Sequence, residues 1–181
     1  MLRKYTDIDL ATLENRSLLV IDDNLSLHRD YKAVLRPDQS NEGDSKLDEL
    51  EDLLLAAPGY KRPPKRQRNF EIQSAYQGEE ACELVRRHLA KGIRYPLAFV
   101  DMRMPPGWDG LETIHQIREI DPAMRFVIVT AYSDYSDAEI QSSLGPQTPV
   151  SIVHKPFEPT KLYELTYELV ADWNQRQTDG A

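Results

Sequence analysis

The sequence predicts an α/β fold: a five-stranded parallel sheet with helices on both faces. Three observations support this fold class. Five short runs with strand character alternate with segments whose apolar residues recur at helical spacing. These helical segments are long enough to form the crossovers that parallel strands require. The inner runs are almost wholly apolar, as expected for strands that helices cover on both faces.

The character of each strand indicates its place in the sheet. Leu18–Ile21, Leu97–Val100 and Arg125–Thr130 are nearly all apolar, which favours central positions. Phe70–Tyr76 alternates apolar and polar residues, and Val150–His154 includes polar residues, so these two runs suit the edges. The resulting order is 2-1-3-4-5, the flavodoxin-like arrangement of a doubly wound sheet.

Helices are expected between the strands and after the last one. Four sets of apolar residues recur at helical spacing: Leu27, Tyr31, Val34 and Leu35; Ala81, Leu84, Val85 and His88; Leu111, Ile114 and Ile117; and Leu162, Leu165, Leu169 and Trp173. Each set lies on one face of a helix and predicts packing against the sheet. No such set is assigned between the fourth and fifth strands.

The chain of 181 residues is long enough for one domain with appendages. We expect the domain to cover residues 17–173, with an N-terminal extension over 1–16 and a C-terminal tail over 174–181. Residues 36–69 interrupt the alternation with a polar loop, an amphipathic helical stretch and a basic, proline-containing stretch. We interpret them as a helical insertion between the first helix and the second strand, either a solvated excursion with one docked helix or a partner-binding element.

Composition excludes several classes of protein. The net charge of -8 argues against a nucleic-acid-binding surface over the whole molecule. The single cysteine, Cys82, excludes an internal disulfide and fits a reducing cytoplasm. No apolar stretch approaches the ~20 residues that span a bilayer, and the first residues lack an apolar signal core. We therefore expect a soluble cytoplasmic protein that contacts neither a membrane nor nucleic acid directly.

Acidic side chains follow two neighbouring strands of the predicted sheet. Asp22 and Asp23 come directly after the first strand, and Asp101 comes after the third. Because open α/β sheets bind ligands at the carboxyl ends of their strands, these three acids are expected to converge in one crevice. Three carboxylates so close together are costly unless a cation holds them. A cation such as magnesium, which prefers oxygen ligands and keeps several waters, suits this set.

Two more strand ends carry groups that suit phosphoryl transfer to an aspartate. Thr130 ends the fourth strand with a hydroxyl, and Lys155 follows the fifth with a compact positive charge. Such transfer needs a divalent cation, a positive side chain for the phosphoryl oxygens and a small donor that senses the product. Each signal alone is weak, since an aspartate after a strand is often a helix cap. Their joint order is much more specific.

These segments resemble the receiver domain of bacterial two-component response regulators, over roughly Arg16–Trp173 apart from the insertion. Four motifs match those of the family: Leu-Leu-Val-Ile-Asp22-Asp23-Asn, Phe-Val-Asp101-Met-Arg-Met-Pro, Val-Thr130-Ala and Lys155-Pro156-Phe. The amino-acid sequence around Asp101 is also similar to that of receivers in multidomain hybrid histidine kinases and cyclic-di-GMP signalling proteins. The resemblance further implies a cis peptide bond between Lys155 and Pro156.

The resemblance implies a role for each motif. Asp101 is expected to be the phosphoacceptor, and Thr130 and Lys155 to contact the phosphoryl group. Asp22, Asp23, Asp101 and the backbone carbonyl of Arg103 are expected to hold Mg²⁺ or Mn²⁺.

The same resemblance implies the partners. The phosphoryl group would come from a histidine kinase or a histidine phosphotransfer protein, and its arrival would switch a protein-interaction surface near the fourth and fifth strands. Further expected partners are an effector domain, in the same or another chain, and a second copy in a homodimer through the last helix. Such a domain is not an enzyme in the ordinary sense, since at most it phosphorylates and dephosphorylates itself.

Three features depart from the family's pattern. The loop from Asp101 to Gly110 is one residue longer than usual. Ile152 occupies a position where the family often has an aromatic residue that turns inward on activation, although Tyr132 or Tyr135 could substitute. The insertion after the first helix falls near the surface where histidine phosphodonors usually dock.

The sequence bears on three other functions. A receiver-like module that docks or dimerises without phosphorylation is the main alternative. A phosphohydrolase of the haloacid-dehalogenase type would carry a second aspartate two residues after the nucleophile, where this chain has Arg103. A nucleotide- or flavin-binding domain would need a glycine-rich loop after the first strand, and this loop is absent from the sequence.

Overall fold

The computed structural model describes residues 10–36, 69–131, 136–145, 148 and 150–179. The strands in these ranges are β1 (Ser17–Ile21), β2 (Glu71–Ala75), β3 (Leu97–Asp101), β4 (Arg125–Thr130) and β5 (Val150–His154). The helices are the short 3-10 helix η2 (Leu10–Thr12), α1 (Leu25–Leu35), α3 (Gly78–Leu89), α4 (Gly110–Ile120), α5 (Asp137–Leu144) and α6 (Pro159–Asp179). Except for its end residues, the predicted insertion over 36–69 lies outside the described residues.

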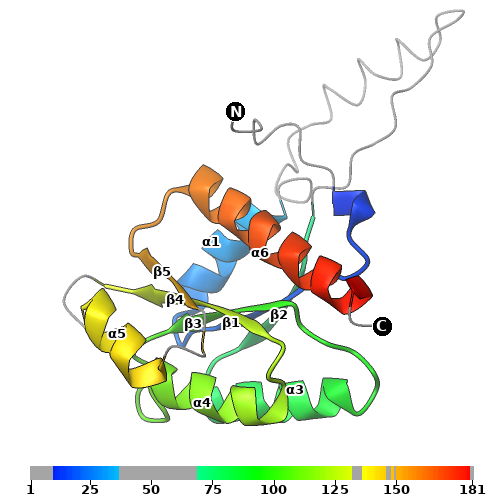
Figure 1. The fold of residues 1–181 in the computed structure, drawn as a ribbon. Helices are drawn as coiled ribbons and strands as arrows, with labels where there is room; N and C mark the ends of the chain where they lie inside the picture. Colours follow the sequence, from blue (N-terminus) through cyan, green and yellow to red (C-terminus); the bar gives the residue numbers. More distant parts are fainter. Residues whose placement is uncertain (1–9, 37–68, 132–135, 146–147, 149, 180–181) are drawn as a thin grey trace, which may run out of the picture.

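The strands form one parallel sheet in the order β2-β1-β3-β4-β5, which confirms the predicted fold class and strand order (Figure 1). All five residues of β3 are buried, whereas β2 alternates exposed with partly buried residues and β5 is only partly buried. These burial patterns match the predicted central and edge positions. In the register between β1 and β3, Ile21 pairs with Val100. Asp22, which follows β1, and Asp101, the last residue of β3, therefore lie side by side at this end of the sheet.

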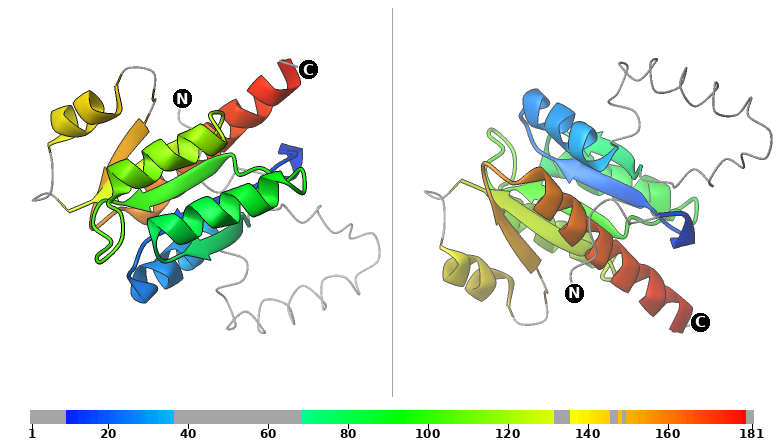
Figure 2. Two further views of the ribbon diagram at one scale, coloured as in Figure 1. Left: turned by 90° about the horizontal axis from the view of Figure 1, so that it is seen from below. Right: turned by 90° about the horizontal axis from the view of Figure 1, so that it is seen from above.

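Helices cover both faces of the sheet. Figures 1 and 2 show α1 and α6 over one face and α3 and α4 over the other, while α5 lies at the β5 edge. Because side chains alternate along a strand, each strand supplies both cores. In β1, Leu18 and Val20 belong to the core beneath α1 and α6, whereas Leu19 and Ile21 belong to the core beneath α3 and α4. The fold is thus two packed layers around one central sheet.

The structure adds a helix that the sequence analysis did not assign. Helix α5 contributes only two buried apolar side chains, Ile140 and Leu144, so its periodic signal is weak. Its start nevertheless carries a capping box, in which Ser136 and Glu139 satisfy each other's backbone N–H groups. The pair Ser-x-x-Glu was the sequence signal for this helix.

Residues from both predicted appendages pack against the domain. Leu10 is fully buried in the core beneath α1 and α6. The side-chain amide of Asn174 donates to the backbone oxygen of Asn15 at 2.8 Å, and its oxygen accepts from the Asn15 N–H at 2.8 Å. Helix α6 continues through residue 174 to Asp179. The division of the chain at residues 17 and 173 stays a prediction.

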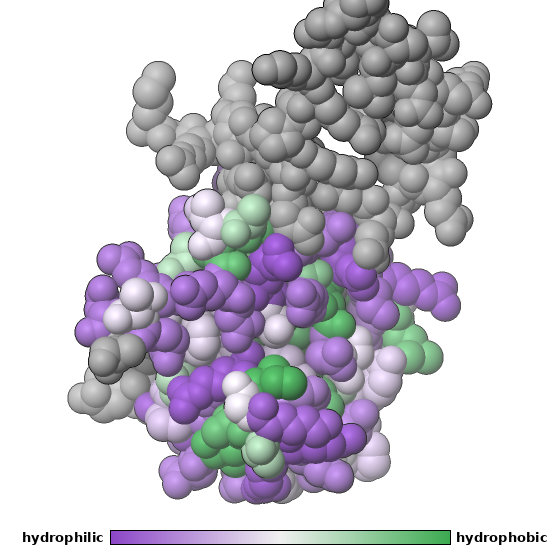
Figure 3. Space-filling view, turned by 90° about the vertical axis from the view of Figure 1, so that its right-hand side faces the viewer, coloured by the Kyte–Doolittle hydropathy of each residue, from purple (hydrophilic) through white to green (hydrophobic). Residues whose placement is uncertain are grey.

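The coloured residues on the face shown in Figure 3 are mostly polar. Hydrophilic residues cover most of the face turned to the viewer in Figure 3, and the apolar patches between them are small and scattered. Among the described residues, no helix combines the length and the apolar character needed to cross a membrane.

Candidate functional site

Three carboxylates meet at the carboxyl ends of β1 and β3. Asp22 and Asp23 follow β1, and Asp101 is the last residue of β3, one residue further than the predicted end of that strand. One oxygen of each of the three side chains lies within 4.8 Å of the other two. Asp22 is 1% exposed and Asp101 is 9% exposed, whereas Asp23 faces solvent. The structure therefore brings the predicted acidic residues together.

Asp22 is held on several sides. Its Oδ1 accepts from the backbone N–H of Asn24 at 2.8 Å, and Asn24 in turn caps the N-terminus of α1. Its backbone oxygen lies 2.7 Å from Nε2 of His28, whose other ring nitrogen lies 3.0 Å from the hydroxyl of Ser74 in β2. These contacts fix the backbone that carries Asp22 between α1 and β2.

Asp101 is oriented by the loop that follows it. Its Oδ2 accepts from the backbone N–H of Arg103 at 2.9 Å. Helix α4 begins close by, because the N–H of Gly110 donates to the backbone oxygen of Met102 at 3.1 Å. Asp109 caps this helix by accepting from the N–H of Glu112. The loop thus turns back tightly on the end of β3.

Lys155 joins two of the acids from the end of β5. Its Nζ lies 2.5 Å from Oδ1 of Asp101 and 3.0 Å from Oδ2 of Asp22. The peptide bond between Lys155 and Pro156 is cis, which confirms that expectation; the bond between Pro105 and Pro106 is also cis. One ammonium therefore faces two buried or nearly buried carboxylates.

Charge at the site remains unbalanced. Burial raises the pKa of the Asp101 carboxyl, although the hydrogen bond and the charge of Lys155 act in the opposite direction. Burial alone would lower the pKa of Lys155, but the hydrogen bond to Asp101 and the charges of Asp22 and Asp101 outweigh it and raise that pKa. Lys155 is therefore charged at neutral pH. Lys155 contacts two of the three clustered acids, and the negative charge concentrated there attracts a further cation.

The donor set fits a hard divalent cation. The converging ligands of Asp22, Asp23 and Asp101 are all carboxylate oxygens, which suit Mg²⁺ and Mn²⁺ rather than metals that favour sulfur or imidazole. The exposure of Asp23 leaves one side open to water, as a magnesium ion that keeps several waters requires. The role of the Arg103 carbonyl in this set stays a prediction.

Thr130 lies beside the acidic cluster at the end of β4. It is fully buried, and its backbone oxygen accepts from the N–H of Lys155 at 2.9 Å. Ile152, in the neighbouring strand β5, is partly buried against the core beneath α3 and α4. Tyr132 and Tyr135, the suggested aromatic substitutes, lie outside the described residues.

The structure shows supporting residues that the sequence analysis did not assign to the site. His28 is buried and contacts the backbone of Asp22. Burial and the charges of Asp22 and Asp101 raise the pKa of Tyr31 well above its ordinary value, so this tyrosine is neutral. Gln77 bridges the β2–α3 connection to the Asp101 loop, since its amide contacts Pro105 and Gly107. The sequence signal for His28 and Tyr31 was their spacing, because residues 28, 31 and 35 share the buried face of α1.

Replacing Gly110 with alanine is expected to destabilise the Asp101 loop. A Cβ at this position would lie 2.6 Å from the backbone oxygen of Asp101 and 3.1 Å from Cα of Met102, so backbone would have to move. We expect the free energy of unfolding to fall by about 1–3 kcal/mol, measured by chemical denaturation. Gly107→Ala is the matched control, because its Cβ would meet only the flexible ends of Gln77 and Glu79. Equal losses in the two variants would contradict this role of Gly110.

Comparisons with known proteins identify a family that this chain resembles. A family model described as the response regulator receiver domain matches residues 60–167, more than half of the chain. Sporulation initiation phosphotransferase F of Bacillus subtilis (strain 168) is 29% identical over 89 residues, which span 49% of this chain and 64% of that protein. The aligned segment therefore covers less than two thirds of this relative.

Solved structures share the fold. The response regulator receiver domain protein (CheY-like) from Methanospirillum hungatei JF-1 is 16% identical, with 90% of this chain and 99% of that chain covered and a TM-score of 0.61. The response regulator receiver protein from Sinorhizobium medicae WSM419 is 21% identical, with 88% and 98% covered and a TM-score of 0.57. The chain belongs to the family of response regulator receiver domains.

Proposed function

We propose that this receiver domain accepts a phosphoryl group on Asp101 in a two-component phosphorelay. The observation that carries the proposal is the cluster at the strand ends, where Asp22, Asp23 and Asp101 converge and Lys155 contacts two of them. Asp101 is the carboxylate best placed as nucleophile. It contacts Lys155, is 9% exposed and accepts a hydrogen bond from the N–H of Arg103.

The transfer forms one bond and breaks another. A carboxylate oxygen of Asp101 attacks the phosphorus of a phosphohistidine, and the new O–P bond forms as the N–P bond breaks. The imidazole of the donor leaves with that electron pair. Water later hydrolyses the acyl phosphate and restores the carboxylate. The chain therefore acts on its own side chain, and we propose a signalling phosphoacceptor rather than an enzyme with a separate substrate.

Asp22, Asp23, Asp101 and the carbonyl of Arg103 would hold Mg²⁺ or Mn²⁺. When bound, this ion neutralises charge between the nucleophile and the incoming phosphoryl group. The Lys155 ammonium, already 2.5 Å from Oδ1 of Asp101, would contact a phosphoryl oxygen.

The phosphoryl group would be sensed at β4 and β5. Thr130 ends β4, and its backbone oxygen accepts from the N–H of Lys155. Its hydroxyl, which here donates to the backbone oxygen of Ala131, would donate to a phosphoryl oxygen instead. A shift of Thr130 toward the phosphoryl group would pull on the connection between β4 and α5. The protein-interaction surface near these elements would change as a result. Because Ile152 is already packed against the core, the change would proceed without an aromatic residue at that position.

A groove beside the cluster supports a protein phosphodonor. It has a volume of about 340 Å³ and lies between α1 and the loop that leads from β5 to α6. Its walls include Leu27, Val34 and Phe157, and Lys155 also lines it. Leu25, at the start of α1, is 64% exposed. An apolar surface next to Asp101 fits a helix of a histidine kinase or a histidine phosphotransfer protein.

Three further assignments complete the proposal. The phosphorylated form would bind an effector domain, in the same or another chain, or a second copy through α6. The single cysteine supports a cytoplasmic location. The net charge of -8 supports protein partners over direct contact with nucleic acid.

The test is incubation with phosphoramidate, a small phosphodonor, followed by intact-mass spectrometry. We expect one phosphoryl adduct in the presence of Mg²⁺ and none when EDTA removes the ion, because the uncompensated carboxylates repel the donor. Addition of Mg²⁺ after EDTA should restore the adduct. An adduct that forms equally well in EDTA would contradict the proposed metal site. The absence of any adduct would favour the alternative of a docking or dimerisation module that works without phosphorylation.

A further inference from the structure

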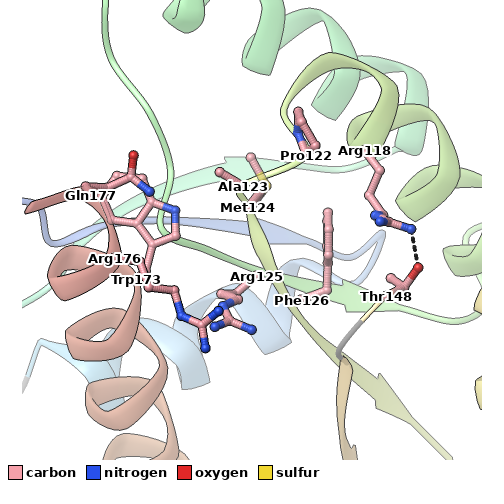
Figure 4. Close-up of a pocket in the computed structure, with 10 residues that line it drawn as sticks. All are labelled: Arg118, Pro122, Ala123, Met124, Arg125, Phe126, Thr148, Trp173, Arg176 and Gln177. Carbon is pink, nitrogen blue, oxygen red and sulfur yellow. Dashed lines mark hydrogen bonds between the residues drawn. The ribbon is translucent and has the colours of Figure 1, made fainter. Parts of the chain in front are cut away.

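A polar cavity lies at the amino end of β4, at the opposite end of the strands from Asp101. It has a volume of about 180 Å³ and is bordered by the C-terminal part of α4, the start of β4 and the C-terminal part of α6 (Figure 4). Arg125 is the first residue of β4 and lines this cavity, whereas Thr130 is the last residue of the same strand and lies beside the acidic cluster. Five residues of a parallel strand rise about 17 Å. The cavity is therefore separate from the site proposed for phosphorylation.

Three arginines from three elements line the cavity: Arg118 of α4, Arg125 of β4 and Arg176 of α6. Figure 4 shows Arg118 with Thr148 on one side and Arg125 and Arg176 on the other. The Arg118 guanidinium donates to the hydroxyl of Thr148.

Asp172, beside the cavity, pairs with both Arg125 and Arg176. Two of the three arginines that line the cavity therefore share one aspartate. The nearby Asp121 pairs with Arg94 at 3.5 Å. A lining of three arginines stands out in a chain of net charge -8.

The remaining walls are apolar and include an unsatisfied donor. Met124, Phe126 and Trp173 are each at least nine-tenths buried and line the cavity. The indole Nε1 of Trp173 is buried and has no hydrogen-bond partner among the described residues. A buried N–H without an acceptor is costly, and an oxygen ligand beside the indole would remove that cost.

We propose that this cavity binds a small phosphomonoester. Guanidinium groups on several sides suit a tetrahedral, doubly charged phosphate, whose oxygens point in different directions. A carboxylate is planar and singly charged, and one bidentate arginine satisfies it. The apolar wall of Met124, Phe126 and Trp173 would accept a small organic group attached to the phosphate. The volume is below the ~300 Å³ typical of sites for drug-sized ligands, so the organic group must be small.

The test is isothermal titration calorimetry of the full chain with inorganic phosphate, phenyl phosphate and succinate. All titrations are done in EDTA at one ionic strength. We expect saturable binding of one equivalent of each phosphate, with phenyl phosphate the tighter because of the apolar wall, and weaker binding of succinate. Arg118→Gln and Arg176→Gln should each weaken phosphate binding about 10-fold or more. Arg86→Gln, on the surface of α3, is the matched control and should bind as the unaltered chain does.

Asp101→Asn separates this proposal from the proposed phosphorylation. Phosphate should bind this variant as tightly as the unaltered chain, because the cavity is remote from residue 101. Absence of saturable phosphate binding would overturn the proposal, as would succinate binding as tightly as phosphate. Binding that survives both arginine substitutions but is lost in Asp101→Asn would place the phosphate at the acidic cluster instead. Thermal melting of Arg118→Gln and Arg176→Gln would verify that both variants are folded.

Discussion

Replacing Asp101 with asparagine is expected to abolish the phosphoryl adduct. The amide lacks the nucleophilic carboxylate oxygen and cannot form the acyl phosphate. It still offers an oxygen to the N–H of Arg103, so the geometry of the loop can persist. The measurement is intact-mass spectrometry after incubation with phosphoramidate and Mg²⁺.

The loss is expected without unfolding. Burial raises the pKa of the Asp101 carboxyl, so this group binds its proton more tightly in the folded than in the unfolded chain. Its contribution to stability therefore becomes less favourable as the pH rises from the unfolded-state pKa through the folded-state pKa. Above that window, removal of the charge should not lower the free energy of unfolding in EDTA.

Asp109→Asn is the matched control in the same loop. Asp109 is the N-cap of α4, and asparagine caps helices about as well as aspartate does. This variant should acquire the adduct as the unaltered chain does. An adduct that survives Asp101→Asn, or one that Asp109→Asn also loses, would contradict the assignment of Asp101.

Replacing Phe99 with alanine is expected to cause a large loss of stability. Phe99 lies in the middle of the central strand β3, between Val20 of β1 and Val127 of β4. It is 1% exposed, and its ring centroid lies 5.1 Å from that of Tyr31 in α1. Removal of a buried aromatic ring leaves a cavity and costs about 3–5 kcal/mol of the free energy of unfolding. Denaturation in urea measures this loss.

Phe99→Leu is the matched variant for this core position. Leucine keeps most of the apolar volume, so its loss should be clearly smaller than that of alanine. Because a domain of this size is stabilised by only about 5–15 kcal/mol, the alanine variant would lose a large share of its stability. A loss below about 1 kcal/mol would show that the β3 core is less tightly packed than the structure indicates.

The sheet was predictable because its signal is local. The apolar runs of β1, β3 and β4 and the polar residues of β2 and β5 each report how many faces of the strand are covered. Order and edges follow from that burial. Helix α5 was not predicted, because a helix of eight residues with two buried side chains has almost no hydrophobic periodicity. Its capping box was the better signal.

The acidic cluster was predictable because strand ends converge. Asp22, Asp101 and Lys155 follow three strands, and the strand order alone brings those ends to one edge of the sheet. His28 was not assigned to the site because a histidine interrupts the apolar pattern of α1. Its contact with the backbone of Asp22 requires knowledge of how that helix is rotated.

The arginine-lined cavity could not be predicted from the sequence. Arg118, Arg125 and Arg176 lie on α4, β4 and α6, and no motif links them. Their approach depends on where α4 and α6 end relative to the start of β4 (Figure 4). In the sequence, nothing distinguishes any of these three arginines from an arginine on the surface.

Chemical trapping of the phosphorylated residue tests the central claim most directly. Borohydride reduces an aspartyl phosphate to homoserine, and peptide mass spectrometry then identifies the altered position. After incubation with phosphoramidate and Mg²⁺, we predict homoserine at residue 101 and unchanged aspartate at residues 22 and 23. Homoserine at residue 22 or 23, or a phosphoryl adduct that leaves Asp101 unreduced, would contradict the account.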